Sequence, residues 1–118
     1  MNVNNYFDKL KNKMDEYVHF VYALTRKFPK EELYGATSQL RRAALSVILN
    51  FVEGFARKRK LVKLNFWETS YGSLKESEYL LLFCSVEKYL EEKDSKKAIQ
   101  MADEIGAMLW KAIEQLEN

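Results

Sequence analysis

The chain of 118 residues has few residues that break helices or cross-link segments, with one proline, four glycines and one cysteine. β-Sandwiches, barrels, collagen and disordered tails need more turn-forming residues or fewer apolar ones, so this composition argues against all four. The lone cysteine excludes an intramolecular disulfide framework and a cysteine-based zinc site. The lone histidine excludes a histidine-rich metal centre.

Long apolar runs and catalytic motifs are also lacking. The sequence has no run of about 18 apolar residues and no apolar segment at its N-terminus, so we expect no membrane span, no signal peptide and a cytoplasmic location. It contains neither a glycine-rich phosphate loop nor a GxSxG motif. A carboxylate-bridged di-iron bundle needs two Glu-x-x-His motifs, and His19 is the only histidine. We therefore expect no enzymatic activity, no metal and no cofactor.

The sequence does have a strong 3.6-residue period. Apolar residues recur at spacings of three and four in four segments, at about 6–27, 37–55, 61–90 and from about 95 onward. This period predicts amphipathic helices. Because the connections between these long helices are short, we expect an all-α, antiparallel up-down-up-down four-helix bundle, formed as a single domain over residues 1–118.

Two features predict how the helices meet their neighbours. In the second helix, the small residues Ala43, Ser46, Asn50 and Gly54 form a stripe along which another backbone can come close. In the third helix, residues 79–84 (Tyr-Leu-Leu-Leu-Phe-Cys) are apolar on every side, and such a helix must be covered on every side. A bundle covers only the inward arc, so we expect a homo-oligomer.

One carboxylate falls on the inward face of the third helix, where Glu78 is in register with Leu74. An unpaired buried carboxylate is costly, so we expect a partner from the second helix. Arg42 is the favoured partner, and Arg41 and Asn50 are the alternatives. A buried ion pair that fixes helix register explains this arrangement better than a catalytic role does. The expected structural polar residues are Glu78, Arg42, Asn50 and Glu53.

Charge is unevenly divided although the net charge is only +2. Residues 1–63 hold 13 Lys and Arg against 6 Asp and Glu, whereas residues 64–118 hold 6 against 11. The asymmetry fits a surface that binds polyanions, and it equally fits oppositely charged helices that lie side by side. The candidate nucleic-acid-binding residues are Arg57, Lys58, Arg59, Lys60, Lys63, Arg41 and Arg42.

Several motifs in combination resemble a known family. They are residues 37–46 (Thr-Ser-Gln-Leu-Arg-Arg-Ala-Ala-Leu-Ser), 50–54 (Asn-Phe-Val-Glu-Gly), 72–78 (Gly-Ser-Leu-Lys-Glu-Ser-Glu) and the loop at 28–35. Together they resemble the four-helix bundle family encoded by intervening sequences in 23S ribosomal RNA genes, once labelled S23 ribosomal proteins. The resemblance implies a homopentamer. It also implies kinship with the accessory variability proteins of diversity-generating retroelements, which bind nucleic acid and a partner reverse transcriptase.

Two functions are therefore open at this stage. The first is a non-enzymatic oligomer that binds RNA or DNA through its basic surface, with a retroelement reverse transcriptase as a further candidate partner. Each phosphate that such a surface neutralises would add a salt-sensitive increment of affinity. The alternative is a scaffold protein, encoded by a 23S rRNA intervening sequence, that holds a protein partner through apolar or acidic surfaces.

Overall fold

The computed structural model describes residues 3–118, and it consists of four long helices joined by short connections. The helices are α1 (Val3–Thr25), α2 (Ser38–Phe55), α3 (Lys60–Val86) and α4 (Glu92–Glu117). A 3-10 turn, η1 (Lys30–Glu32), and a short π-helical turn, η2 (Leu33–Thr37), lie between α1 and α2. No strand occurs in the described part of the chain. The expected all-α four-helix bundle is confirmed.

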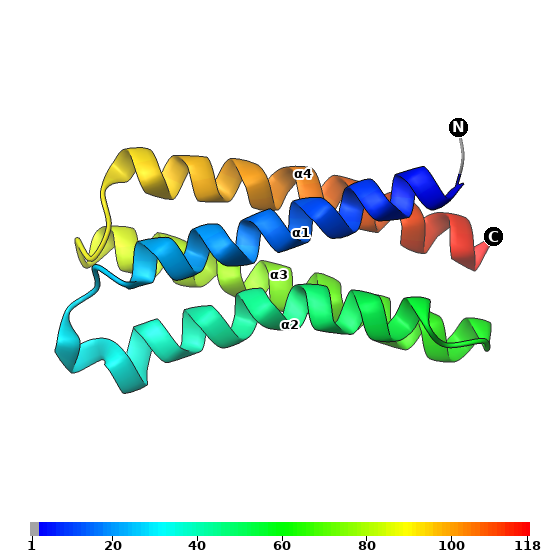
Figure 1. Cartoon of the computed structure of the whole chain (residues 1–118), viewed down its shortest axis with the longest axis horizontal. Helices are drawn as coiled ribbons and strands as arrows, with labels where there is room; N and C mark the ends of the chain where they lie inside the picture. The colour runs from blue at the N-terminus through cyan, green and yellow to red at the C-terminus, as the bar shows by residue number, and fades with distance from the viewer. Residues whose placement is uncertain (1–2) are drawn as a thin grey trace.

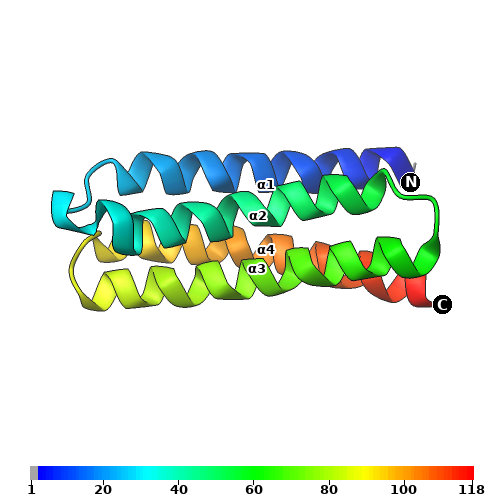
Figure 2. The ribbon, with the colours of Figure 1, turned by 90° about the horizontal axis from the view of Figure 1, so that it is seen from below.

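The helices lie lengthwise beside one another and alternate in direction (Figures 1 and 2). Each packs against the next along the chain, and α4 returns to pack against α1, within an envelope of 44 × 26 × 18 Å. The α2–α3 connection lies at one end of the bundle, together with the C-terminus, and the other two connections lie at the opposite end (Figure 1). Across residues 3–118, no helix is long and apolar enough to cross a membrane.

The core lies where the periodic apolar faces of the four helices meet. The buried side chains of α1 follow the predicted spacing of three and four, and the other helices contribute matching faces. At the middle of the core, the hydroxyl of Tyr17 lies 2.7 Å from that of Ser77. Because the Ser77 hydroxyl also donates to the Leu74 carbonyl at 2.7 Å, the Tyr17 hydroxyl is the donor of the pair. The largest fully buried apolar side chains are Tyr17, Phe51, Leu10, Met14, Leu40, Leu74, Leu81, Ile105 and Leu109.

The seam between α2 and α3 is lined by small side chains, as the stripe on the second helix predicts. The Ser70 hydroxyl donates to the Val47 carbonyl at 2.6 Å, so a side chain of α3 bonds directly to the backbone of α2. At the end of the seam, a Cβ added to Gly54 would lie 2.5 Å from Cδ1 of Trp67. The Trp67 indole is itself held, because its Nε1–H donates to the Phe51 carbonyl at 3.2 Å.

The helix ends differ from the predicted ones by a few residues. α1 ends at Thr25 instead of residue 27, because i→i−3 hydrogen bonds tighten the chain ahead of Pro29. α3 ends at Val86 instead of residue 90. There Lys88 adopts the left-handed conformation (φ 64°), and the Tyr89 N–H donates to the Cys84 carbonyl in a Schellman-type end. Glycine usually occupies that position, so the sequence contained no stop signal.

The fit of Gly54 against Trp67 yields a first prediction. Gly54→Ala should lower the free energy of unfolding by about 1–3 kcal/mol, the usual cost of overpacking, although alanine is the better helix former. Gly72→Ala is the matched control, because nothing lies within 4 Å of a Cβ at that position of α3. It should raise stability by about 0.5–1 kcal/mol. Thermal melts followed by circular dichroism measure both, and equal stabilisation by the two substitutions would contradict the close contact at Gly54.

Candidate nucleic-acid interface

The basic cluster predicted from the sequence lies where the chain turns from α2 into α3. Arg57, Lys58 and Arg59 belong to the connection, and Lys60 and Lys63 to the first turn of α3. We call these five residues the basic corner. All are exposed except Lys63, which is half-buried.

Two of the corner cations hold the turn together. The Lys63 ammonium donates to the carbonyls of Gly54 and Phe55 at 3.2 and 3.1 Å, so it caps the C-terminal end of α2. A cation at this end of a helix also compensates the helix dipole. Arg57 forms an ion pair with Glu53, one turn earlier on α2. The Glu53 carboxylate therefore offsets one of the corner charges.

The remaining corner cations are freer. Lys60 donates to the backbone carbonyl of Glu117 at 3.2 Å and so ties the corner to the end of α4. Lys58 and Arg59 have no carboxylate within 4 Å among the described residues. Their side chains are exposed and can reach an external anion without breaking an internal ion pair.

The structure does not bring Arg41 and Arg42 to this corner. Both lie near the start of α2, about 15 residues before Arg57, which corresponds to roughly 22 Å along a helix. The seven candidate residues therefore lie in two separate groups along the bundle. The 3.6-residue period shows which face of a helix a residue lies on. It does not show which cations share one end of the bundle.

The predicted pairing of Glu78 with Arg42 is wrong. The Glu78 side chain is only 16% exposed, but its Oε2 lies 3.5 Å from the Lys75 ammonium of the same helix, and Oε1 is buried with no hydrogen-bond partner. Arg42 is exposed and lines the groove over the α2–α3 seam, together with Ser73 and Glu76 of α3. The α3 face that meets α2 carries serines, among them Ser70 and Ser73, whereas Glu78 is turned toward α4. Asn50 likewise bonds within its own helix.

Burial raises the pKa of Glu78, and the neighbouring Asp103 of α4 raises it further, while the Lys75 ammonium acts in the opposite direction. The folded protein therefore favours the protonated acid more than the unfolded chain does. The free energy of unfolding then falls as the pH rises from the ordinary pKa of 4.5 through the raised value.

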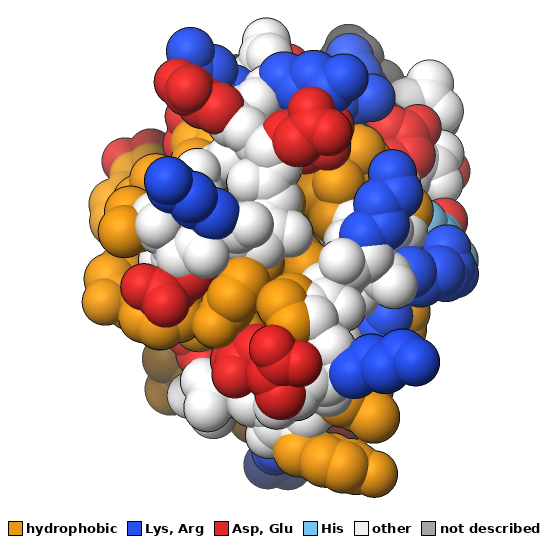
Figure 3. Space-filling view, turned by 90° about the vertical axis from the view of Figure 1, so that its left-hand side faces the viewer, with side chains coloured by type: hydrophobic (Ala, Val, Ile, Leu, Met, Phe, Trp, Pro, Cys, Tyr) orange, Lys and Arg blue, Asp and Glu red, His pale blue; other side chains and the backbone are white. Residues whose placement is uncertain are grey.

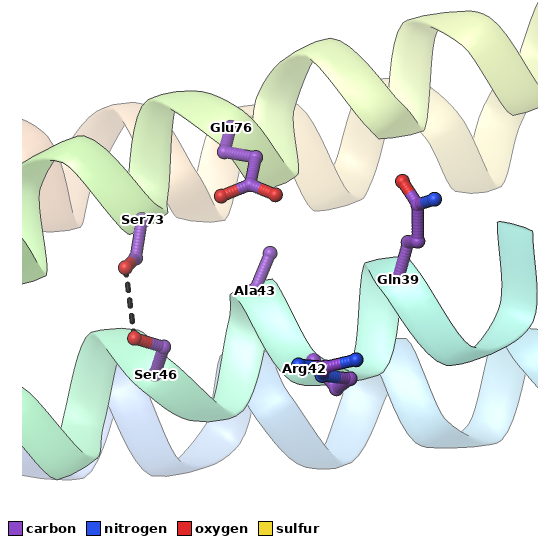
Figure 4. Close-up of a pocket in the computed structure, with 6 residues that line it drawn as sticks. All are labelled: Gln39, Arg42, Ala43, Ser46, Ser73 and Glu76. Atoms are coloured by element: carbon purple, nitrogen blue, oxygen red, sulfur yellow. Dashed lines mark hydrogen bonds between the residues drawn. The ribbon is translucent and has the colours of Figure 1, made fainter.

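A polar groove of about 440 Å³ lies over the α2–α3 seam, and the sequence reasoning did not identify it (Figure 4). Ser46 and Ser73 face each other across it with their hydroxyls 2.8 Å apart, and Glu76 reaches in from α3. Asn50 donates to the backbone carbonyl and the hydroxyl of Ser46, at 2.8 Å each. Glu76 is the only titratable acid or base besides Arg42 in this lining, so the groove offers no pair for acid–base catalysis.

Neither the lone histidine nor the lone cysteine adds a reactive site within residues 3–118. His19 is exposed and lies 3.4 Å from Asp15, one turn earlier on α1. Cys84 is buried, and burial, with Glu32 and Glu87 adding to the effect, raises its pKa to about 11. A thiol with that pKa stays protonated and inert near neutral pH. In the described residues, no three His, Cys, Asp or Glu side chains are grouped as metal ligands would be.

The sequence profile of the 23S rRNA-intervening sequence proteins matches residues 9–111 of this chain. The chain belongs to that family. A solved structure has a similar fold: it is that of a protein of unknown function from the S23 ribosomal protein family of Bacteroides thetaiotaomicron VPI-5482, at a TM-score of 0.82. The two chains are 18% identical over 88% of this chain and 97% of the other, so the likeness concerns the fold. No curated protein matches the sequence. The family predicted from the motifs is confirmed.

The environment of Glu78 yields a second prediction. Glu78→Gln should leave the free energy of unfolding equal to or above that of the wild type near neutral pH, because the amide carries no charge to desolvate. The advantage should shrink below about pH 4.5, where the wild-type acid is protonated in both states. Urea titrations at both pH values measure this. Glu76→Gln, at an exposed position two residues earlier, is the control. A loss of about 3–5 kcal/mol in Glu78→Gln would indicate a broken buried ion pair instead.

Proposed function

We propose that this family member is a non-enzymatic oligomer that binds nucleic acid through the basic corner. The observation behind the proposal is that Lys58 and Arg59 are exposed and unpaired at a turn whose geometry Arg57 and Lys63 stabilise. Because the turn is already fixed, its free cations can neutralise phosphates with little further loss of backbone conformational freedom. Such contacts bind the backbone of RNA or DNA without reading its sequence.

The corner is suited to phosphates more than to bases. Its exposed cations are consecutive in the chain, and no aromatic residue interrupts them. The nearest rings already have partners: Phe66 lies under Arg57 at 5.2 Å, Trp67 is buried, and the half-exposed Phe55 packs edge-on against Phe7 at 5.3 Å. Because base stacking needs an exposed aromatic face, we expect little preference between single and double strands.

The third prediction tests this role. The double variant Lys58→Gln/Arg59→Gln should bind labelled RNA and DNA more weakly than the wild type. It should also reduce the slope of log K against log salt by about 1–2, in line with one lost phosphate contact per cation. Neither residue contacts a carboxylate, so the melting temperature should not change.

A matched control removes the same charge elsewhere. Lys93→Gln/Lys96→Gln alters two exposed lysines near the start of α4, at the opposite end of the bundle (Figure 1). These lysines lie 3.7 and 3.3 Å from Glu91 and Glu92. The control should retain the wild-type salt slope. If both double variants lose the same affinity, or if the wild type does not bind at low salt, the basic corner is only a solvated turn.

The oligomer part of the proposal is supported by apolar side chains that point outward. Leu45, Leu49 and Val52 recur one turn apart on the outer face of α2, and Leu49 is 58% exposed. In the apolar run of α3, Leu81 and Cys84 are buried, whereas Tyr79, Leu82 and Phe83 are exposed. Hydrophobic side chains gather on one side of the end view (Figure 3). Exposed apolar side chains that recur along a helix face favour an interaction site there.

A fourth prediction concerns this surface. We expect the wild type to sediment as a homo-oligomer at micromolar concentration, with five subunits as the number that the family resemblance implies. Leu49→Glu should shift it toward the monomer while helicity is retained, because a charge would be buried at the contact. Gln100→Glu, at an exposed polar position of α4, should not. A wild-type monomer at this concentration would refute the oligomer.

The second candidate function is a protein scaffold, and the same outward apolar side chains favour it. On the family resemblance, a reverse transcriptase is one such partner. Gene neighbourhood distinguishes the contexts: a reverse transcriptase gene and a template repeat beside this gene would favour the retroelement role. A location inside a 23S rRNA gene would favour the intervening-sequence role.

A further inference from the structure

A second cationic site lies at the other end of the bundle, where α1 turns into α2. A pocket of about 480 Å³ opens there, a volume typical of small-molecule sites. It combines three cations and two threonines with an apolar wall. The residues are Arg26, Lys30, Arg41, Thr25, Thr37, Phe28, Pro29 and Leu33. In the view onto this end, Lys and Arg side chains line one side of the surface (Figure 3).

Arg41 is held in place by two neighbours from α1. Its Nε–H donates to the Thr25 hydroxyl at 2.7 Å, and its guanidinium carbon lies 4.6 Å from the centre of the Tyr22 ring. The Thr25 hydroxyl in turn donates back to α1, where the Val21 carbonyl lies at 2.8 Å. This bond directs a lone pair of the Thr25 hydroxyl oxygen at Arg41. The guanidinium is fixed through one of its five N–H donors and one of its faces, which leaves the N–H groups of both Nη atoms for a ligand.

No internal carboxylate neutralises these cations. Within residues 3–118, neither Arg26, Lys30 nor Arg41 has a carboxylate oxygen within 4 Å. Glu31 and Glu32 follow Lys30 in the chain but do not line the pocket. The Glu32 carboxylate instead accepts from the Ala36 N–H at 3.2 Å. The pocket therefore has three positive charges that face solvent.

We propose that this pocket binds a phosphate monoester that carries an apolar or planar group, which is the chemistry of a mononucleotide. A phosphate monoester has a charge of about −1.5 to −2 at pH 7, and its oxygens match the fork of an arginine. The buried Phe28 and the half-exposed Leu33 provide an apolar wall for the attached group. A simple carboxylate would offset less of the charge and would leave that wall unused.

The neighbouring arginine provides a matched control within the same turn of helix. Arg42 has the same charge and lies one residue later, but it lines the polar groove with Glu76 and not this pocket. The rotation of about 100° between consecutive helical residues separates the two guanidinium groups. Arg41→Gln and Arg42→Gln therefore change the net charge identically, and only the first removes a pocket ligand.

The experiment is a titration of the full chain with adenosine 5′-monophosphate, inorganic phosphate and adenosine, followed by calorimetry or by amide NMR shifts. We expect saturable binding of the nucleotide, weaker binding of phosphate and none of adenosine. Arg41→Gln should weaken nucleotide binding by about tenfold to a hundredfold, the range for a hydrogen bond between charged groups, whereas Arg42→Gln should change it less than about twofold. Lys58→Gln/Arg59→Gln should bind the nucleotide as the wild type does, because the basic corner lies at the other end.

Three results would overturn the proposal. They are no saturable binding of the nucleotide, adenosine binding as tight as that of the nucleotide, and equal losses in Arg41→Gln and Arg42→Gln. Because Arg41→Gln also removes a hydrogen bond to Thr25, its fold is checked by thermal melting. If that variant does not fold, Arg26→Gln/Lys30→Gln replaces it, since both side chains are exposed. A wild-type affinity in this double variant would equally overturn the proposal.

Discussion

The close contact between α2 and α3 is the constraint on which the other features depend. Gly54 leaves room for the Trp67 indole, and the Ser70 hydroxyl bonds to a carbonyl of α2, so the two helices pack closely along the seam. The seam fixes the end of α2 against the start of α3. There Lys63 can reach back to cap α2, and the corner cations are held at a defined turn. A wider seam would separate the capping ammonium from its carbonyls.

Some cations of this protein stabilise its turns and others are free for external anions. The groups around each cation decide which role it has. Arg57 and Lys63 are engaged by a carboxylate and by backbone carbonyls, so they stabilise the turn. Lys58 and Arg59 have no such partners and are available to external anions. Arg41 is intermediate, because its Nε–H is engaged while its outer N–H groups are not. The count of basic residues therefore overstates the charge that each surface offers.

The apolar residues are divided in a similar way. α3 is apolar over much of its surface, and the bundle buries only the face with Leu74, Leu81 and Cys84. Tyr79, Leu82 and Phe83 of α3 and the outer stripe of α2 remain exposed, and none of them belongs to the basic corner or to the pocket at the other end. The proposed nucleic-acid contact and the proposed subunit contact therefore involve different side chains.

The sequence by itself determined the helical class and the inward faces, because the 3.6-residue period and the sparse helix breakers act locally. The family followed from the resemblance of its motifs. The sequence also located the small-residue stripe and the basic corner. The end of α3 was not predictable, because Lys88 occupies a left-handed position where no glycine marks the stop. The tertiary structure alone decided the partners of the polar side chains. Glu78 and Arg42 lie on suitable helices, but the rotation of α3 turns Glu78 toward α4, and only packing sets that rotation. The different surroundings of Arg41 and Arg42 follow from packing too, because a helical period fixes the angle between neighbours and not what each one meets.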